Sequence, residues 1–273
     1  MRLWATATVA VVAVLLSSLA WAQFGRGGNA SINAHMARPD SFDGKFHYCR
    51  AAYRMNPAGD GGGWLTDYPL ADIDLSIRVA ELTRIQVSFD APEQPNHLIV
   101  RLTDDVLFQC PFIMMQEVGT LFFSDEDAKR LRTYLLKGGF LWVDDFWGSY
   151  AWDIWAAQIR KVLPPSEFPM FDLQPDHPIY HTMFDLKKGV PQIPSINFWY
   201  GSRGGTSERG ADSAQVHARA IANAKGDVMV LMTHNTDVSD SWEREGEDPN
   251  YFYAFSVDGY QVAINVLIYA MTH

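Results

Sequence analysis

Cysteine is scarce in this chain, and its scarcity excludes several kinds of site. Only two of the 273 residues are cysteines, Cys49 and Cys110, and they lie 61 positions apart. That spacing forms neither a CxxC redox motif nor a zinc knuckle. In an oxidising compartment two thiols often pair, but each cysteine also lies in an apolar run that suits a buried free thiol. The sequence leaves both alternatives open.

Basic residues are also few, and they form no run. Lysine and arginine number 22 against 32 aspartate and glutamate residues, so the formal net charge is −10. Nucleic-acid binding depends on clustered positive charge that neutralises phosphates. The composition therefore predicts no nucleic-acid partner.

Long apolar runs are missing after the first 22 residues. An uncharged run follows Arg2 and ends in the small-residue pattern Ala20-Trp21-Ala22. This pattern is typical of a cleaved secretory signal peptide, here residues 1–22, and predicts a periplasmic or secreted protein. If the run were not cleaved, it would be long enough for a membrane anchor. It is the only membrane contact that the sequence predicts.

The rest of the chain divides into a short tether and one domain. Residues 23–42 are rich in Gly, Ala and Asn without an apolar period, which predicts a flexible N-terminal segment. Expected strands and helices alternate from residue 43 to residue 273. That alternation predicts a single α/β domain with a doubly wound, mostly parallel sheet and helices on both faces.

The clearest local signals lie in residues 121–148. Ser124 and Asp127 have the spacing of a capping box, and the Gly138-Gly139 pair is typical of a helix end. The apolar run at 140–143 follows at once and predicts a central parallel strand. Ligands of open α/β sheets gather where such strands end.

Two carboxylates, Asp144 and Asp145, follow this expected strand. Adjacent strand residues point to opposite faces, so one of the two is expected to face a cleft. An aspartate there can serve as a general base, a nucleophile or a metal ligand, and it can equally cap the next helix.

Other polar and aromatic residues are expected near the same edge of the sheet. Asp104 and Asp105 end another expected strand, and carboxylates with imidazoles suit a divalent cation or a polyhydroxyl ligand. Each also has an ordinary alternative, as a turn aspartate, a loop-fixing imidazole or an aromatic core residue. The remaining candidates are His177, His181, His234, Trp147 and Trp199.

Several phrases, taken together and in order, resemble the bacterial family called "domain of unknown function 4159", over about residues 43–273. They are GGWLTDYPLADIDLSIRVAELT (62–83), DVLFQCPFIMM (105–115), FFSDEDAKRLRTYLLKGGFLWVDDFWG (122–148), DHPIYH (176–181) and the closing Asn265, Tyr269 and Ala270. The resemblance implies the flavodoxin-like fold of class I glutamine amidotransferases and implies no established reaction.

In those amidotransferases the nucleophile is a cysteine on a tight strand-to-helix turn. The corresponding turn here is 144–148, where Phe146, or Asp145 after a shift of one residue, takes the place of the thiol. A cysteine-dependent glutaminase is therefore not expected.

The sequence supports two classes of function. The first is an exported, non-catalytic or degenerate amidotransferase-like module that binds a small polar ligand or an envelope protein. The alternative is an Asp/His-based hydrolase, metal-assisted in one version, that acts on a sugar or peptide-like substrate. Asp145, Asp144 and His177 are its expected catalytic residues. No cofactor or particular metal is indicated.

Overall fold

The computed structural model describes residues 34–273. The expected signal peptide at 1–22 and most of the expected flexible segment at 23–42 lie outside the described residues. Chain contacts separate Met1–His35 from Met36–His273, and the domain described below is the second of these units. Within residues 34–273 no helix is both long and apolar enough to cross a membrane.

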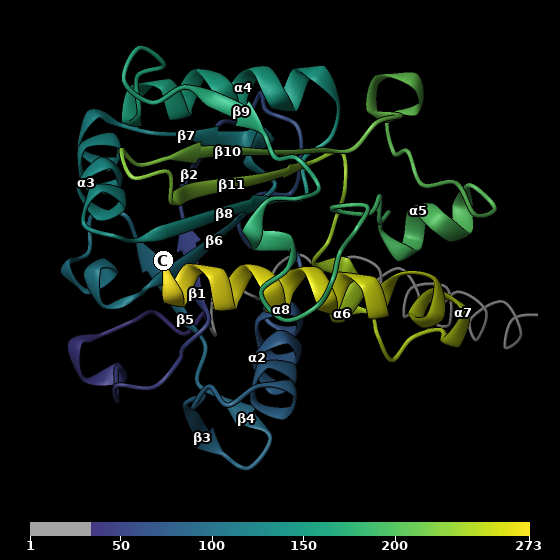
Figure 1. Ribbon diagram of the computed structural model, residues 1–273, viewed down its shortest axis with the longest axis horizontal. Coiled ribbons are helices and arrows are strands. Elements are labelled where there is room, and N and C mark those ends of the chain that lie inside the picture. Colours follow the sequence, from purple (N-terminus) through teal and green to yellow (C-terminus); the bar gives the residue numbers. More distant parts are fainter. Residues whose placement is uncertain (1–33) are drawn as a thin grey trace, which may run out of the picture. The chain divides into compact units, whose positions relative to one another are not determined.

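A seven-stranded sheet forms the centre of the domain (Figure 1). In spatial order the strands are β5 (Leu98–Arg101), β1 (Cys49–Ala52), β6 (Phe112–Gln116), β8 (Phe140–Asp144), β11 (Val228–His234), β10 (His217–Ala222) and β9 (Met170–Asp172). Five neighbouring strands pair in parallel, and at one side of the sheet β10 pairs antiparallel with both of its neighbours, β11 and β9. The α/β class and the mostly parallel sheet are thus confirmed.

Helices cover both faces of this sheet (Figure 1). The sheet divides the core into two apolar clusters, one on each face. Successive residues of a strand point to opposite faces, so Val143 belongs to one cluster and Trp142 to the other. The first cluster includes residues of α3 (Asp125–Leu136) and α4 (Gly148–Val162). The second includes residues of α2 (Leu70–Leu82), α6 (Asp240–Glu243) and α8 (Val257–Thr272).

Short elements complete the described part of the chain. Two small ribbons pair β2 (Arg54–Met55) with β7 (Leu121–Phe122) and β3 (Phe89–Ala91) with β4 (Gln94–Pro95). The short helices are α5 (Ile196–Gly201) and α7 (Pro249–Tyr251). Single helical turns, one of them a π turn, are η2 (Pro39–Ser41), η3 (Asp105–Gln109), η4 (Val118–Thr120), η5 (Pro178–Tyr180), η6 (Gly210–Ser213) and η7 (Phe252–Ser256).

The two cysteines form a disulfide. Cys49 lies in β1 and Cys110 lies two residues before β6, and their Cα atoms are 6.2 Å apart. The bond therefore ties two neighbouring parallel strands together through the core. It also decides between the alternatives that the sequence leaves open, and no described cysteine remains as a free thiol.

The capping box of α3 is present as the sequence predicts. Ser124 Oγ accepts a hydrogen bond from Asp127 N (3.2 Å), and Asp127 Oδ2 accepts one from Ser124 N (3.0 Å). We expect Ser124→Ala to lower the unfolding free energy by about 1 kcal/mol, because the amide of Asp127 loses its acceptor and Asp127 Oδ2 loses the hydroxyl donor. Urea unfolding measures this, with Ser124→Thr as the control that retains the hydroxyl. Equal stability of Ser124→Ala and the unmodified protein would show that the cap contributes nothing.

Candidate functional site

Acidic and amide side chains converge at the carboxyl ends of the parallel strands. Gln116 is the last residue of β6, Asp144 is the last residue of β8, and Asp237 comes three residues after β11. Asp67 reaches the same place from the segment between β2 and α2, and Asp240 begins α6. This edge includes the point between β1 and β6 where the strand order changes direction, which is where open α/β sheets bind ligands.

The backbone is unusual at the same edge. Six non-glycine residues of 34–273 have a positive φ, and four of them lie here: Asp67 (63°), Glu117 (47°), Asp145 (54°) and Asn235 (63°). Glu117, Asp145 and Asn235 directly follow β6, β8 and β11. Left-handed backbone costs energy in residues other than glycine, and it clusters at functional sites. The turns that follow β6, β8 and β11 therefore have backbone conformations that are energetically unfavourable for these residues.

One hydroxyl lies among three oxygen acceptors at the centre of the edge. Ser239 Oγ is 3.1 Å from Asp67 Oδ2, 3.0 Å from Gln116 Oε1 and 2.9 Å from Asp237 Oδ1. A serine hydroxyl has a single proton and can donate it to only one of them. Asp237 Oδ1 also accepts from Asp240 N (2.9 Å). The arrangement has more acceptors than donors, which suits a ligand that brings positive charge or protons.

We refer to Asp67, Gln116, Asp237, Ser239 and Asp240 as the cluster. Asp144, an expected catalytic residue, lies beside it, and both of its carboxylate oxygens accept hydrogen bonds. Its Oδ1 accepts from Thr233 Oγ1 (2.5 Å) and its Oδ2 accepts from Ser239 N (3.0 Å). The side chain is fully buried, and burial raises its pKa to about 7. Asp144 thus fixes the segment after β11, which carries Asp237.

Asp145, the second expected residue of this pair, points elsewhere at the same edge. Its Oδ1 accepts from Trp147 Nε1 (3.0 Å), so Trp147 is a buried partner of this carboxylate. Burial, followed by the negative charges of Glu117 and Asp67, raises the pKa of Asp145 well above its ordinary value. The ionised form of this carboxyl group is therefore disfavoured by its surroundings.

The other carboxyl groups of the cluster are perturbed in the same direction. Burial and then Asp145 and Asp67 raise the pKa of Asp237, and burial and then Asp67 raise that of Asp240 to about 7. Two arginines lie close by, and both have partners. Arg50 pairs with Asp72, and Arg244 Nε lies 3.6 Å from Asp240 Oδ1 and 2.6 Å from Glu243 Oε2. The described residues therefore leave a surplus of acid at this edge.

The glycine-rich loop at 56–63 contacts this edge through Glu117. Glu117 Oε2 accepts from Gly63 N (2.6 Å) and from Thr66 Oγ1 (2.8 Å). A Cβ added at Gly61, where φ is +124°, would lie 3.0 Å from the same oxygen. The loop thus surrounds a carboxylate of the protein itself, and its glycines permit that close approach.

Asp104 and Asp105 lie apart from the cluster, beside the edge strand β5. Asp104 Oδ2 accepts from Arg101 N (3.0 Å), and the exposed Asp105 pairs with Arg130 (2.8 Å). These contacts are those of turn aspartates.

The expected histidines make local contacts. His177 Nδ1 accepts from Ile179 N (3.2 Å) and so caps η5. His181 Nε2 donates to Pro175 O (2.9 Å), and its Nδ1 lies 2.9 Å from Asp185 Oδ1. No hydrogen bond or ion pair within residues 34–273 joins any histidine to Asp67, Asp237 or Asp240.

His234 and Trp199 pack among other rings. His234 Nε2 donates to Gly148 O (3.0 Å), its ring lies against Phe146 and Trp152, and burial lowers its pKa to about 4. A neutral, stacked imidazole is a structural contact. Trp199 packs edge-on against two aromatic rings, those of Tyr251 and Phe255.

Sequence reasoning missed Asp67, Gln116, Glu117, Asp237 and Asp240. A usable signal exists for three of them. Gln116 and Glu117 follow the apolar run at 112–115, and Asp237 follows the run at 228–232, as Asp144 and Asp145 follow 140–143. Asp67 and Asp240 carry no such signal, because each is brought to the edge by tertiary contacts.

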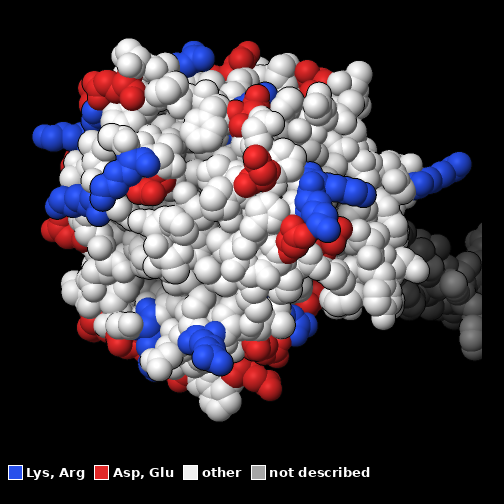
Figure 2. Space-filling model, in the orientation of Figure 1, with Lys and Arg blue, Asp and Glu red and all other residues white. Residues whose placement is uncertain are grey.

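The surface itself does not identify the site. On the face shown in Figure 2, acidic and basic side chains are interspersed among broad uncharged areas. A hollow of about 310 Å³ lies beside α4 and β9, and its lining, which includes Trp152 and Met170, contains no member of the cluster. Asp237 is 3 % exposed, whereas Asp67 is partly exposed, so the cluster meets solvent on the Asp67 side.

The chain belongs to the family described as "Domain of unknown function (DUF4159)", whose model matches residues 50–271. No curated protein matches it. The cluster, Glu117 and the predicted pair Asp144 and Asp145 all lie within the matched residues.

Proposed function

We propose that this protein is an exported binding module with a degenerate amidotransferase-like, flavodoxin-like fold. Counted along the chain, its five parallel strands have the spatial order 2-1-3-4-5, which is the flavodoxin-like order. The disulfide supports an oxidising compartment, and the signal-peptide pattern supports export. The resemblance places a thiol at Phe146, or at Asp145 after a shift of one residue, and Asp145 has a left-handed φ of 54° in this strand-to-helix turn.

The module holds a small polar ligand through the carboxylates at the sheet edge. One observation carries this proposal: the carboxyl groups of Asp67, Asp145 and Asp237 are gathered where such sheets bind ligands, and the described residues do not neutralise them. A cationic or polyhydroxyl ligand complements them. We do not propose the Asp/His-based hydrolase, because the histidines make their contacts elsewhere.

Thermal unfolding with a panel of ligands tests the proposal. Calcium chloride, a diamine, an amino sugar and a neutral trisaccharide are compared with succinate, an anion that the carboxylates repel. A ligand that binds only the folded protein at 100 times its Kd adds about 2.7 kcal/mol of stability and raises the midpoint. We expect at least one of the first four to do so, and succinate to have no effect.

Variants locate the effect at the site. Asp145→Asn removes a charge at the edge, and we expect it to reduce the ligand-induced rise in the midpoint. Asp153→Asn removes one charge from an exposed position of α4 and serves as the matched control. A panel without any rise, or a rise unchanged in Asp145→Asn, would contradict the proposed site.

A further inference from the structure

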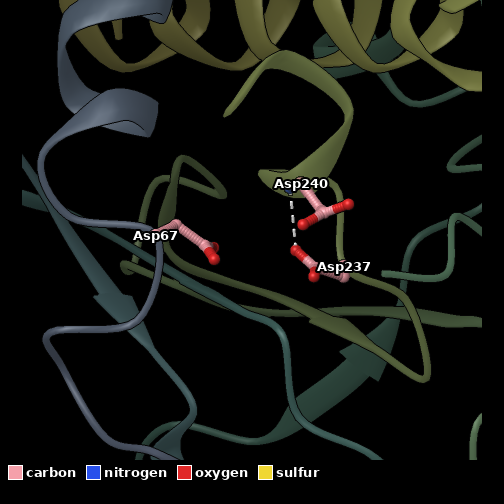
Figure 3. Close-up of side chains that lie close together, drawn as sticks. All are labelled: Asp67, Asp237 and Asp240. Atoms are coloured by element: carbon pink, nitrogen blue, oxygen red, sulfur yellow. Dashed lines mark hydrogen bonds between the residues drawn. The ribbon is translucent and has the colours of Figure 1, made fainter. Parts of the chain in front are cut away.

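We propose that Asp67, Asp237 and Asp240 form a site for a divalent cation of the calcium class. This inference rests on the proposed function and names the ligand of the same edge. Each of the three residues offers a carboxylate oxygen, and these oxygens all lie within 4.8 Å of one another. Figure 3 shows Asp67 approaching from one side and Asp237 and Asp240 from the other, with their carboxylates directed toward a shared space.

The size and chemistry of the oxygen set favour calcium. Calcium takes oxygen ligands at roughly 2.3 to 2.6 Å, so two oxygens on opposite sides of the ion are about 5 Å apart. Three oxygens within 4.8 Å of one another are close enough to share one such ion. The set contains no nitrogen or sulfur ligand, which disfavours zinc and copper.

Asp67 and Asp237 each retain a carboxylate oxygen for a cation, and Asp240 offers its Oδ1, which lies 3.6 Å from Arg244 Nε. Asp240 Oδ2 is committed to Ile196 N (2.7 Å) and Tyr251 OH (2.9 Å), which fix the orientation of its side chain. Asp237 is fixed by the donation from Asp240 N to its Oδ1. No hydrogen-bond donor of residues 34–273 reaches Asp67 Oδ1 or Asp237 Oδ2. The ligands are thus held in place by their other contacts and are still able to bind an ion.

Gln116 gives an independent indication of a ligand. It is completely buried, its Oε1 contacts Ser239 Oγ in the cluster, and its Nε2 has no partner. If the amide is turned by 180°, Nε2 donates to Ser239 Oγ, and Ser239 donates to Asp237. Gln116 Oε1 is then the atom without a partner, and an amide carbonyl is a calcium ligand. In the first orientation Nε2 lacks an acceptor, which a water on a bound ion would supply, and in the turned orientation Oε1 itself can bind the ion.

Calorimetric titration tests the site. The full chain is freed of metal with EDTA, dialysed, and titrated first with calcium chloride and then with magnesium chloride. We expect one calcium ion per chain and weaker binding of magnesium. Asp237→Asn and Asp67→Asn each remove a ligand charge, and we expect a loss of affinity of at least tenfold in each. Asp153→Asn, on the exposed side of α4, should bind as the unmodified protein does. Circular dichroism shows whether each variant is folded. If Asp237→Asn does not fold, the calcium affinity of Asp67→Asn tests the site alone.

The outcomes separate this inference from the proposed function. Calcium binding that survives both substitutions would place the ion elsewhere and overturn the inference. Absence of calcium and magnesium binding also overturns it, while a rise in the unfolding midpoint with an amino sugar or trisaccharide, lost in Asp145→Asn, would leave the proposed function standing. If no member of the panel binds, both fail.

Discussion

Replacing Asp72 with alanine is expected to lower the unfolding free energy by about 3 to 5 kcal/mol. Arg50 in β1 and Asp72 in α2 are both completely buried. Arg50 Nε donates to both carboxylate oxygens of Asp72, at 2.9 and 3.1 Å, and a further donation comes from its Nη2. The substitution leaves the guanidinium charged, buried and without its counter-ion, which is a far larger penalty than the loss of one hydrogen bond.

The same arginine connects stability to the site. Arg50 Nη1 donates to Trp64 O (3.0 Å) and to Thr66 O (2.8 Å), the residue before Asp67. Loss of this clamp frees the segment that places Asp67 in the cluster. We therefore expect the double variant Arg50→Met/Asp72→Leu to recover most of the stability, because a buried pair can be replaced by apolar groups, and still to bind ligand weakly.

Urea unfolding and ligand titration of the single and double variants measure these effects. The double variant is the control that removes the charge imbalance together with the clamp. A loss of less than about 1 kcal/mol for Asp72→Ala would mean that water or another group compensates Arg50.

The second large effect is a fall in stability as pH rises, measured in the presence of EDTA. Burial raises the pKa of Asp144 from 3.8 to about 7, and that of Asp240 from 3.8 to about 7. A carboxyl group whose pKa is higher in the folded state stabilises the protein fully below the unfolded value. That stability is lost as pH rises through the folded value. The window therefore runs from about pH 4 to above pH 7.

The magnitude is large because the groups are buried. For the fully buried Asp144 alone, the difference between 3.8 and about 7 corresponds to about 4 kcal/mol, at 1.36 kcal/mol for each pKa unit. Unfolding free energies from urea titrations at pH 4.5, 6 and 8 measure the trend. Millimolar calcium should reduce the slope, because a cation compensates the ionised carboxylates. Stability that increases steadily from pH 5 to pH 8 in EDTA would contradict the assignment of raised pKa values.

Much of the fold could be predicted because its signals are local. The capping box at Ser124, the glycine pair at 138–139 and the apolar run at 140–143 each act within a few residues, and α3 and β8 lie where the sequence predicts them. Pro111 immediately precedes β6, as suits a residue that cannot donate a backbone hydrogen bond within a strand. The same local signals also predict the location of the site, because they place the carboxyl end of β8 at the edge of the sheet where the cluster lies.

Strand β10 was missed for a physical reason. Its sequence, HARAIA, contains two charged or titratable residues and only a short apolar pattern, and its pairing with β11 is antiparallel. A strand near the side of a sheet needs less apolar surface than a central one, so its composition resembles that of a loop.

The make-up of the cluster could not be predicted, because it depends on contacts between distant residues. Asp67 and Ser239 are separated by 172 positions and meet at 3.1 Å. That meeting depends on the order of the parallel strands and on the Arg50 clamp, neither of which leaves a local pattern. The expected histidines do not join the cluster, because contacts close to them in the sequence hold them elsewhere. His177 and His181 are engaged by backbone or side-chain atoms within six residues of themselves, contacts that residue type alone does not indicate.

The stability of Asp237→Asn in EDTA at pH 7.5 tests most directly whether the cluster exists for a ligand. Asparagine keeps the acceptor for Asp240 N and Ser239 Oγ and removes one charge from a repulsive set. We predict that the variant is more stable than the unmodified protein by about 1 kcal/mol or more, while its ligand affinity falls. A variant that is less stable by the same amount would show that Asp237 serves the fold, and would contradict a ligand site at this edge.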